Sequence, residues 1–418
     1  MSRIRIKNFG PIREGCSTND GWMDIKKVTL FIGPQGSGKS TAAKAFSTLS
    51  WLEKAVNRGD VDRIKFNFNT LSTYLKYQRI NNYLKKETIL GYEGDAVTFL
   101  SAPGLFPPDI IVKPASDFRI PKIMYVPAER NFLSVVKNAY GVKNLPDTLY
   151  TFAEELRKGQ LDLKGAKIQL PLADLQYTYD EANETSLLIG NGYKLDLLES
   201  ASGYQSLIPL FLVTKFLTDD LQKGEGLRRE RLSVEHSIKR NKEISDVLYN
   251  PSFIHLTEAE KMERVRTINA RYLSTCLLNI VEEPEQNLFP ETQKQLLYSL
   301  LEFNNLLAGN TLLLTSHSPY LISYLTLAVK ASILLARTKN DDLRSRIEHI
   351  VPAKSAIAPD DLAIYQFDEV NGSIEMLDPF EGLPSDENLL NQKTGDNNDL
   401  FAELLEIEQA IENENNFR

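Results

Sequence analysis

One short segment of the chain has residue types and a spacing that suit phosphate binding. Gly33, Gly38, Lys39 and Ser40 satisfy the pattern G-x-x-x-x-G-K-[ST]. In such a loop the backbone N–H groups surround a polyphosphate, the lysine ammonium reaches its outer phosphates, and the serine hydroxyl ligates Mg²⁺. A glycine turn without a ligand is the alternative. The nucleotide-binding loop predicted by this pattern consists of Gly33, Pro34, Gln35, Gly36, Ser37, Gly38, Lys39, Ser40 and Thr41.

Two adjacent acids follow an apolar run later in the chain. Residues 277–281 read as a buried strand, and Glu282 and Glu283 come directly after it. Burying a carboxylate is unfavourable unless a cation or a hydrogen bond compensates for the lost hydration. Mg²⁺ bound to a nucleotide would supply that compensation. We therefore expect Glu282 to join Ser40 as a metal ligand and Glu283 to polarise an attacking water.

Two other apolar runs end in polar residues that belong to the same pattern. His317 follows residues 311–315, and we expect it to contact the γ-phosphate; a structural histidine is the alternative. Glu129 and Arg130 follow residues 123–126, where ligands meet open α/β sheets. They are candidate sensors of the γ-phosphate or of metal-bound water, and a structural ion pair is the alternative.

A second helix start has residues that suit an anion. Ser202 and Gly203 precede the apolar run 207–217, which predicts a long helix. A helix N-terminus attracts anions through its free N–H groups and its dipole. Taken alone, a serine and a glycine at this point form only a helix cap.

The elements that position these residues predict an α/β fold with a mainly parallel central sheet. Residues 28–32 read as a strand and 40–52 as a helix, so the phosphate loop lies between them. Ile4 and Ile6 alternate with bases in an N-terminal β segment. We divide the chain into the N-terminal strands with the phosphate loop, a first insertion, a core segment ending in the 207–217 helix, a charged helical insertion, a second core segment and an acidic tail. These segments are 1–52, 53–120, 121–218, 219–272, 273–384 and 385–418.

Composition is typical of a soluble globular protein. The 418 residues are 42% hydrophobic and 25% charged, with a formal net charge of −8. An acidic chain makes DNA binding a less favoured function, although the bases of the first strand and the lysines and tyrosines of residues 71–86, which we expect to be helical, leave it open. The two cysteines exclude a disulfide framework. No signal peptide or uncharged apolar stretch of membrane-spanning length is present, so we expect a cytoplasmic protein without a membrane partner.

The acidic tail contains an amphipathic helix. Asp399 is a candidate cap for it, with acids largely on the face opposite the apolar residues. This helix could fold back onto its own domain or dock on a basic surface of an effector or a neighbouring subunit. Its apolar face consists of Leu400, Phe401, Leu404, Leu405 and Ile411.

Taken in order, these motifs resemble the ABC-type ATPase heads of the SMC, RecF and OLD-like superfamily. The set comprises the phosphate loop, Val-Pro-Ala-Glu-Arg, Ser-Ala-Ser-Gly-Tyr-Gln, Glu-Glu-Pro-Glu and Thr-Ser-His-Ser. The resemblance implies an ABC/RecA-like fold that hydrolyses ATP with Mg²⁺, Glu283 as the catalytic acid and His317 as the switch histidine. It also implies that Ser202, Gly203 and Gln205 form a signature motif that acts across a head-to-tail homodimer or a higher oligomer.

The set is most similar to the ATPase subunit of PARIS-type anti-phage systems. That resemblance implies a switch protein that senses a phage-derived trigger protein and controls a separately encoded effector, a nuclease of the TOPRIM class. A DNA-repair ATPase and a transporter ATPase subunit are the rivals. Three departures favour the OLD-like soluble branch. Tyr204 replaces the second signature glycine, Glu282 replaces an aspartate, and no glutamine occupies the expected Q-loop, where Glu129 or Arg130 would stand in.

Overall fold

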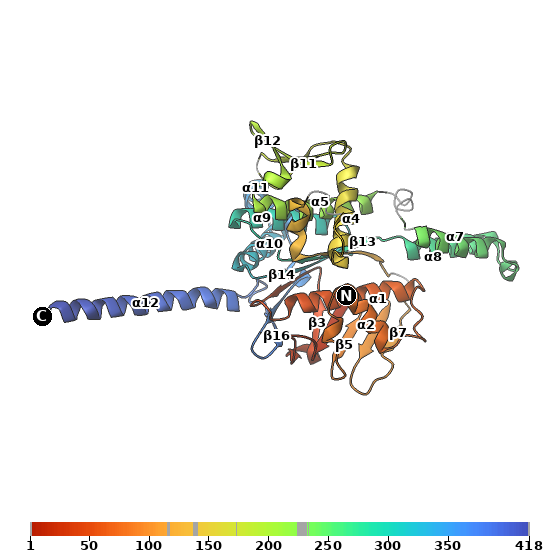
Figure 1. Ribbon diagram of the computed structural model, residues 1–418, viewed down its shortest axis with the longest axis horizontal. Helices are drawn as coiled ribbons and strands as arrows, with labels where there is room; N and C mark the ends of the chain where they lie inside the picture. Colours follow the sequence, from red (N-terminus) through yellow and green to blue (C-terminus); the bar gives the residue numbers. More distant parts are fainter. Residues whose placement is uncertain are drawn as a thin grey trace.

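The computed structural model describes residues 2–114, 118–136, 141–172, 174–223, 232 and 234–416. The side chains of residues 394, 397 and 412–416 are outside this description. A body of sheets and helices carries two projections that point in opposite directions, helix α12 on one side and the helix pair α7 and α8 on the other (Figure 1).

The described helices alternate with strands along much of the chain. Their bounds are α1 Lys39–Asn57, α2 Phe68–Tyr77, α3 Phe132–Val135, α4 Asp147–Asp162, α5 Ser202–Gln222, α7 Val234–Tyr249, α8 Glu258–Tyr272, α9 Pro290–Asn305, α10 Pro319–Arg337, α11 Asp341–Ile350 and α12 Leu389–Asn416. The strands are β1 Ser2–Lys7, β2 Gly15–Cys16, β3 Trp22–Ile25, β4 Val28–Ile32, β5 Ile89–Glu93, β6 Val97–Ser101, β7 Asp109–Val112, β8 Pro121–Val126, β9 Ile168–Gln169, β10 Gln176–Asp180, β11 Thr185–Gly190, β12 Tyr193–Asp196, β13 Cys276–Glu282, β14 Thr311–Ser316, β15 Leu362–Phe367 and β16 Ser373–Met376.

A seven-stranded sheet in the order β2-β16-β15-β4-β14-β13-β8 forms the centre of the body. The five neighbouring strands from β15 to β8 are parallel, and β16 is antiparallel to β15. Strand β4 has the bounds that the sequence predicted, and all five of its residues are buried. The predicted α/β class with a mainly parallel central sheet is confirmed.

The sheet has a hydrophobic core on each face. Leu30 and Ile32 of β4 belong to a core that includes residues of α5, α9 and α10. Phe31 points to the other face, into a core shared with α1 and the N-terminal strands. This division follows from the alternation of side chains along a strand. Both faces are covered, which explains why the parallel strands are continuous apolar runs.

The N-terminal antiparallel β segment belongs to a second sheet, with the order β3-β1-β5-β6-β7. Strand β1 lies between β3 and β5, so it is an interior strand and its bases do not protect an edge. Arg3 pairs with Glu93 and its guanidinium lies 4.8 Å from the Trp22 ring centroid. Residue 52, the expected end of the first segment, lies within α1, and β5 to β7 of the expected insertion complete the sheet begun by β1.

The region from 167 to 196, predicted as β structure, forms a third sheet in the order β12-β11-β10-β9. The charged region after residue 218 forms an antiparallel helix pair, α7 and α8, with a small core of Val247, Ile268 and Tyr272. Residues 224–231 and 233 of that region lie outside the described residues.

Two helices differ from their predicted limits. Helix α2 ends at Tyr77 because Arg79 takes a left-handed backbone conformation (φ 59°), which stops the helix short of the predicted residue 86. Helix α12 begins at Leu389, and the Asn388 side chain accepts a hydrogen bond from the Asn391 N–H at 3.1 Å. The cap expected at Asp399 is therefore wrong, since Asp399 lies inside the helix.

In the part of the chain that the structure describes, α10 is the one helix whose length and composition meet the criterion for a membrane span. Its Leu325, Ala328 and Val329 belong to the main core. A core helix of a globular body satisfies the same criterion, so this is weak evidence for a membrane segment.

Candidate functional site

The register of the parallel strands brings the ends of β4, β14 and β13 to one level. Ile32 is opposite Ser316, and Thr315 is opposite Glu282. The residues that follow these strands therefore leave the sheet side by side: the phosphate loop, His317 and Glu283. The carboxyl edge of a parallel sheet is where ligands bind in open α/β folds.

The phosphate loop is shaped by close contacts as well as by its glycines. Gly33 has a φ of 145°, and a Cβ added there would lie 2.4 Å from the carbonyl oxygen of Phe367 in β15. No side chain fits at that position. The Ser37 hydroxyl closes the turn by donating to the Pro34 carbonyl at 2.8 Å. The first turn of α1 then starts at Lys39, with its leading N–H groups free of intrahelical partners.

Lys39 lies over the loop. Its Nζ donates to the carbonyl oxygens of Gly33 at 2.8 Å and Pro34 at 2.7 Å. Burial lowers the pKa of this ammonium to about 8, while Glu283 and Glu285 act in the opposite direction. Lys39 thus remains mostly protonated at neutral pH, and a phosphate would restore the favourable electrostatics lost through burial.

Glu282 faces the side of α1 that carries Ser40. Its Oε2 accepts the Ala128 N–H at 3.1 Å, and its Oε1 lies 3.8 Å from Nζ of Lys44. Lys44 is four residues after Ser40 and shares its face of the helix. The Glu282 carboxylate therefore lies along the face of α1 that carries Ser40, where the two residues could act as a pair of oxygen ligands.

The Ser40 hydroxyl and the Glu282 carboxylate suit a Mg²⁺ ion that is bound together with phosphate. Mg²⁺ in nucleotide enzymes takes one or two protein oxygens, with substrate phosphates and waters completing its shell. Within the described residues, no group of three or more His, Cys, Asp or Glu residues could hold a metal ion.

Glu283 and His317 form a pair at the mouth of the site. Nε2 of His317 lies 3.5 Å from Oε1 of Glu283, and both side chains are about one-third exposed, at 34% and 36%. The histidine contact is the main cause that lowers the pKa of Glu283. Glu283 has a φ of 44°, and its N–H donates to the Thr315 carbonyl at 2.9 Å. The charged, accessible carboxylate is suited to accept a proton from water.

Glu285 also belongs to the site, although the sequence did not single it out. One of its oxygens, Oε1, accepts the Ser316 hydroxyl and the His317 N–H, both at 2.8 Å. Burial raises the pKa of this carboxyl group. Glu285 thus positions the backbone of His317. The sequence feature that could have identified Glu285 is its position as the third acid of the Glu-Glu-Pro-Glu segment.

Arg130 is buried and connects three elements. Its guanidinium donates to the carbonyl oxygens of Glu282 and Glu283, both at 2.6 Å, and of Ser206 in α5 at 3.1 Å. Burial lowers its pKa to about 10, with nearby carboxylates opposing that change. These contacts favour a structural function for Arg130. The sensor function stays a prediction, and Glu129 beside it is exposed.

The signature residues occupy the start of α5. Ser202 is exposed and Gly203 lies against the loop after β13, where an added Cβ would be 2.8 Å from the Asn287 carbonyl oxygen. Gln205 is buried, and its Nε2 donates to the carbonyl oxygens of Leu197 at 3.2 Å and Leu198 at 3.0 Å. Gln205 therefore supports the turn before the helix. An action of these residues across a dimer stays a prediction.

Pro209 lies within α5 and determines how the helix is attached. A proline has no N–H, so the carbonyl of Gln205 loses its usual helical donor. The Ser134 hydroxyl of α3 donates to that carbonyl at 2.8 Å instead. Arg130 and Ser134 together hold the first turns of α5 against the end of β8.

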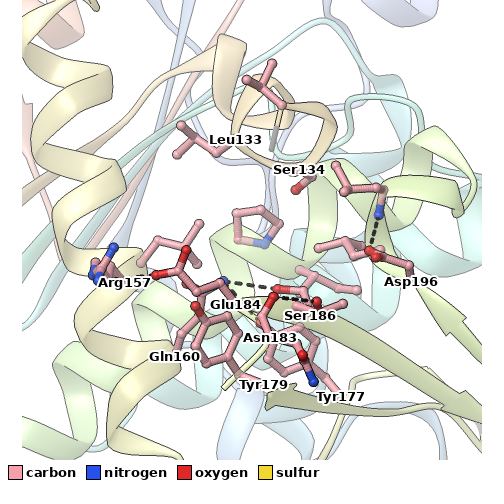
Figure 2. A pocket seen from close by; sticks show the side chains of 17 residues that line it. Leu133, Ser134, Arg157, Gln160, Tyr177, Tyr179, Asn183, Glu184, Ser186 and Asp196 are labelled. Carbon is pink, nitrogen blue, oxygen red and sulfur yellow. Dashed lines mark hydrogen bonds and ion pairs between the residues drawn. The ribbon is translucent and has the colours of Figure 1, made fainter. Parts of the chain in front are cut away.

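A cavity of about 260 Å³ lies next to this attachment, between α4, the β10 and β11 strands and the start of α5. Figure 2 shows the polar groups of its floor. Gln160 Nε2 donates to the Ser186 hydroxyl at 3.1 Å, and the Tyr177 and Ser186 hydroxyls are 2.8 Å apart. The third sheet is therefore joined to α4 by hydrogen bonds beside this cavity.

No protein-family model and no curated protein sequence matches the chain. Among solved structures, the SMC head domain from Thermotoga maritima is similar at 11% identity, with 92% of this chain and 98% of that chain covered and a TM-score of 0.36. An SMC head bound to the C-winged helix domain of ScpA has 8% identity, coverage of 90% and 95%, and a TM-score of 0.38. The ATP-binding cassette MJ0796 bound to ADP and Pi has 12% identity, coverage of 91% and 100%, and a TM-score of 0.25. The fold and the site described above follow from the strand order and register of this chain itself.

The contacts of Arg130 lead to a prediction about stability. Arg130→Met keeps the length of the side chain but removes the donors to four carbonyl groups, those of Pro127, Glu282, Glu283 and Ser206. We expect the free energy of unfolding to fall by roughly 2–4 kcal/mol, as measured by urea denaturation. Arg266→Met is the matched control, because Arg266 is 76% exposed and pairs with Glu263 of its own helix, and its effect should stay within about 0.5 kcal/mol. Equal effects of the two changes would contradict the structural function of Arg130.

Proposed function

We propose that this chain binds ATP with Mg²⁺ and hydrolyses it. The observation that carries the proposal is the convergence of Lys39, Glu282, Glu283 and His317 at the carboxyl edge of three adjacent parallel strands. A structural lysine or an isolated ion pair would not need the phosphate-binding turn beside it.

Each residue then has a defined task. The loop amides and the Lys39 ammonium hold the outer phosphates, and Ser40 and Glu282 provide metal ligands. The metal, when bound, neutralises charge that develops on the phosphate oxygens. Glu283 accepts a proton from the attacking water. His317, fixed at its backbone by Glu285, orients that carboxylate and reaches toward the terminal phosphate.

The active unit that we propose is a head-to-tail dimer. Ser202 starts a helix other than the one that follows the phosphate loop, and its side chain is exposed. A signature serine at such a helix N-terminus is suited to contact a phosphate held by a second chain. Two composite ATP sites would form in each dimer.

We further propose that ATP turnover serves as a switch in anti-phage defence, in a cytoplasmic protein. The support is the ordered set of sequence motifs, which resembles PARIS-type ATPase subunits. The chain would respond to a phage-derived trigger protein and hold or release a separately encoded nuclease of the TOPRIM class. Copurification of the chain with its operon neighbours, with and without ATP, tests this step separately from hydrolysis.

A DNA-repair ATPase is the second candidate. The feature that bears on it is the projecting pair α7 and α8, which is rich in bases. Several of these bases are paired with acids: Lys239 with Asp60 at 2.7 Å, and Arg271 with Glu243 at 2.9 Å. Paired charges attract a phosphate backbone less strongly than free ones. Stimulation of ATP hydrolysis by DNA would favour this second function.

The first test concerns binding. Lys39→Ala removes the charge that faces the outer phosphates, and we expect ATP affinity to fall by roughly 10- to 100-fold in isothermal titration. Lys65→Ala is the control, because that side chain is 85% exposed. An unchanged affinity for Lys39→Ala would place the nucleotide elsewhere.

The second test separates binding from chemistry. Glu283→Gln keeps the shape of the side chain but cannot accept the proton of the water. ATP binding should be preserved, while the hydrolysis rate falls by roughly 10²- to 10⁴-fold. Glu291→Gln, a change at an exposed acid of α9, should leave the rate unaltered. Normal hydrolysis by Glu283→Gln would show that the catalytic acid lies elsewhere.

The third test addresses the dimer. Lys39→Ala and Ser202→Arg should each abolish ATP hydrolysis, the second by blocking the partner's site. A mixed dimer of the two variants would contain one intact composite site, so we expect up to about half of the wild-type rate per dimer. Dimers of Lys39→Ala alone are the control. Verified mixed dimers without any recovered activity would mean that each site is complete within one chain.

A further inference from the structure

Helix α12 presents an apolar stripe to solvent. The helix extends away from the body (Figure 1), and the described side chains from Asn391 onward are exposed. Its base is fixed, because the Leu389 N–H donates to Oε1 of Gln366 at 2.7 Å. The tail helix therefore does not fold back onto its own domain. The exposed fractions of the stripe are Leu400 59%, Phe401 63%, Leu404 61%, Leu405 44%, Ile407 49% and Ile411 54%.

The charges around this stripe limit what can cover it. Between residues 391 and 411 the chain has one base, Lys393. Two identical α12 helices packed together would bring acids close to one another, which is unfavourable. A complementary surface would be apolar with a basic rim. The acids of this segment are Asp396, Asp399, Glu403, Glu406 and Glu408.

The chain has a surface of that kind, between the end of α10 and α11. It is an open groove of about 830 Å³. Leu334, Leu343 and Ile350 are apolar side chains of this groove that are 38%, 43% and 58% exposed. Its basic members are Arg337 and Arg346, with His349, and no carboxylate is among its described lining residues.

The two surfaces also agree in length. The stripe from Leu400 to Ile411 extends over ~17 Å at about 1.5 Å per residue. Helix α11 has 10 residues, which makes it ~15 Å long. Burial of the stripe in the groove would remove two sets of exposed apolar side chains from water and place acids beside bases.

We propose that α12 of one copy docks in the α10–α11 groove of a second copy of this chain. The helix points away from the body that carries its own groove, which favours an intermolecular contact (Figure 1). The contact joins two different surfaces, so it is heterologous and can build rings or larger assemblies. It uses no residue of the nucleotide site and does not depend on the proposed function.

The experiment uses the full chain carrying Lys39→Ala, without nucleotide, so that an ATP-dependent dimer cannot contribute. Analytical ultracentrifugation should show assemblies whose population rises with protein concentration. Leu404→Glu in the helix and Leu343→Glu in the groove should each raise the dissociation constant at least tenfold. Ile254→Glu is the matched control: Ile254 is 82% exposed at the tip of the other projection, and its change should have no effect.

Mixing separates a contact of the two surfaces from independent effects. The Leu404→Glu chain keeps an intact groove and the Leu343→Glu chain keeps an intact helix, so the mixture should form mixed dimers that do not grow further. Arg346→Glu should weaken assembly. Glu408→Lys on the other chain of the pair should recover part of the loss, because Glu408 follows Leu404 by four residues and precedes Ile411 by three, on the same face of the helix. Higher salt should weaken the wild-type contact.

Three results would overturn the proposal. The first is a chain that remains monomeric at ~100 µM, well above the range of ordinary specific contacts. The second is assembly that persists unchanged in both variants. The third is a separately encoded protein that binds α12 while Leu343→Glu has no effect on self-association, since the helix would then serve another partner.

Discussion

The alignment of three parallel strand ends is the constraint on which the site depends. Because Ile32, Ser316 and Glu282 lie within one residue of the same level, the loop and the side chains that follow these strands meet without any long connection. A shift of one residue in β13 would turn Glu282 to the opposite face of the sheet, since side chains alternate along a strand. The buried apolar side chains on both faces of the sheet fix that register. Packing of the core therefore determines where the residues of the site lie relative to one another.

The site also depends on compensation of the buried carboxylates at the carboxyl ends of these strands. Glu282 and Glu285 are carboxylates in or beside a buried strand, and such groups need donors. Ala128, Ser316 and His317 provide them, and Arg130 and Lys39 bring positive charge into the same volume. The donors come from the segments after β8 and β4 and from the end of β14, so the acids also link these strand ends. Arg130 extends this link to α5, because the same guanidinium holds carbonyl oxygens of β13, the residue after it, and the signature helix.

Local patterns predicted the strands and the loop correctly, because these features depend on nearby residues. Strand β4 matches its apolar run, and Glu282 at the end of β13 follows the rule that a buried charge needs a compensating partner. Features set by distant contacts were missed. The sequence left Arg130 open between a sensor and a structural ion pair, since nothing in it shows that the Ser206 carbonyl of α5 lies within reach of the guanidinium. The cap of α12 was placed at Asp399 from its residue type, whereas the position of Asn388 beside β15 determines where the helix begins.

The outer elements are attached at points that differ in their distance from the nucleotide site. The α7 and α8 pair joins the core just before β13, at the amino edge of the sheet, far from the strand ends that carry the chemistry. Helix α12 is attached near those ends. The N–H of Leu389, the first residue of α12, donates to the side chain of Gln366 in β15. Gln366 lies opposite Ile32, the residue of β4 that precedes the phosphate loop. The carbonyl oxygen of the next residue, Phe367, lies close to Gly33 of the loop. Only one strand thus separates α12 from the loop. A movement of the loop that displaced β15 would alter the base of α12 directly, which gives the tail helix a short physical connection to the phosphate site.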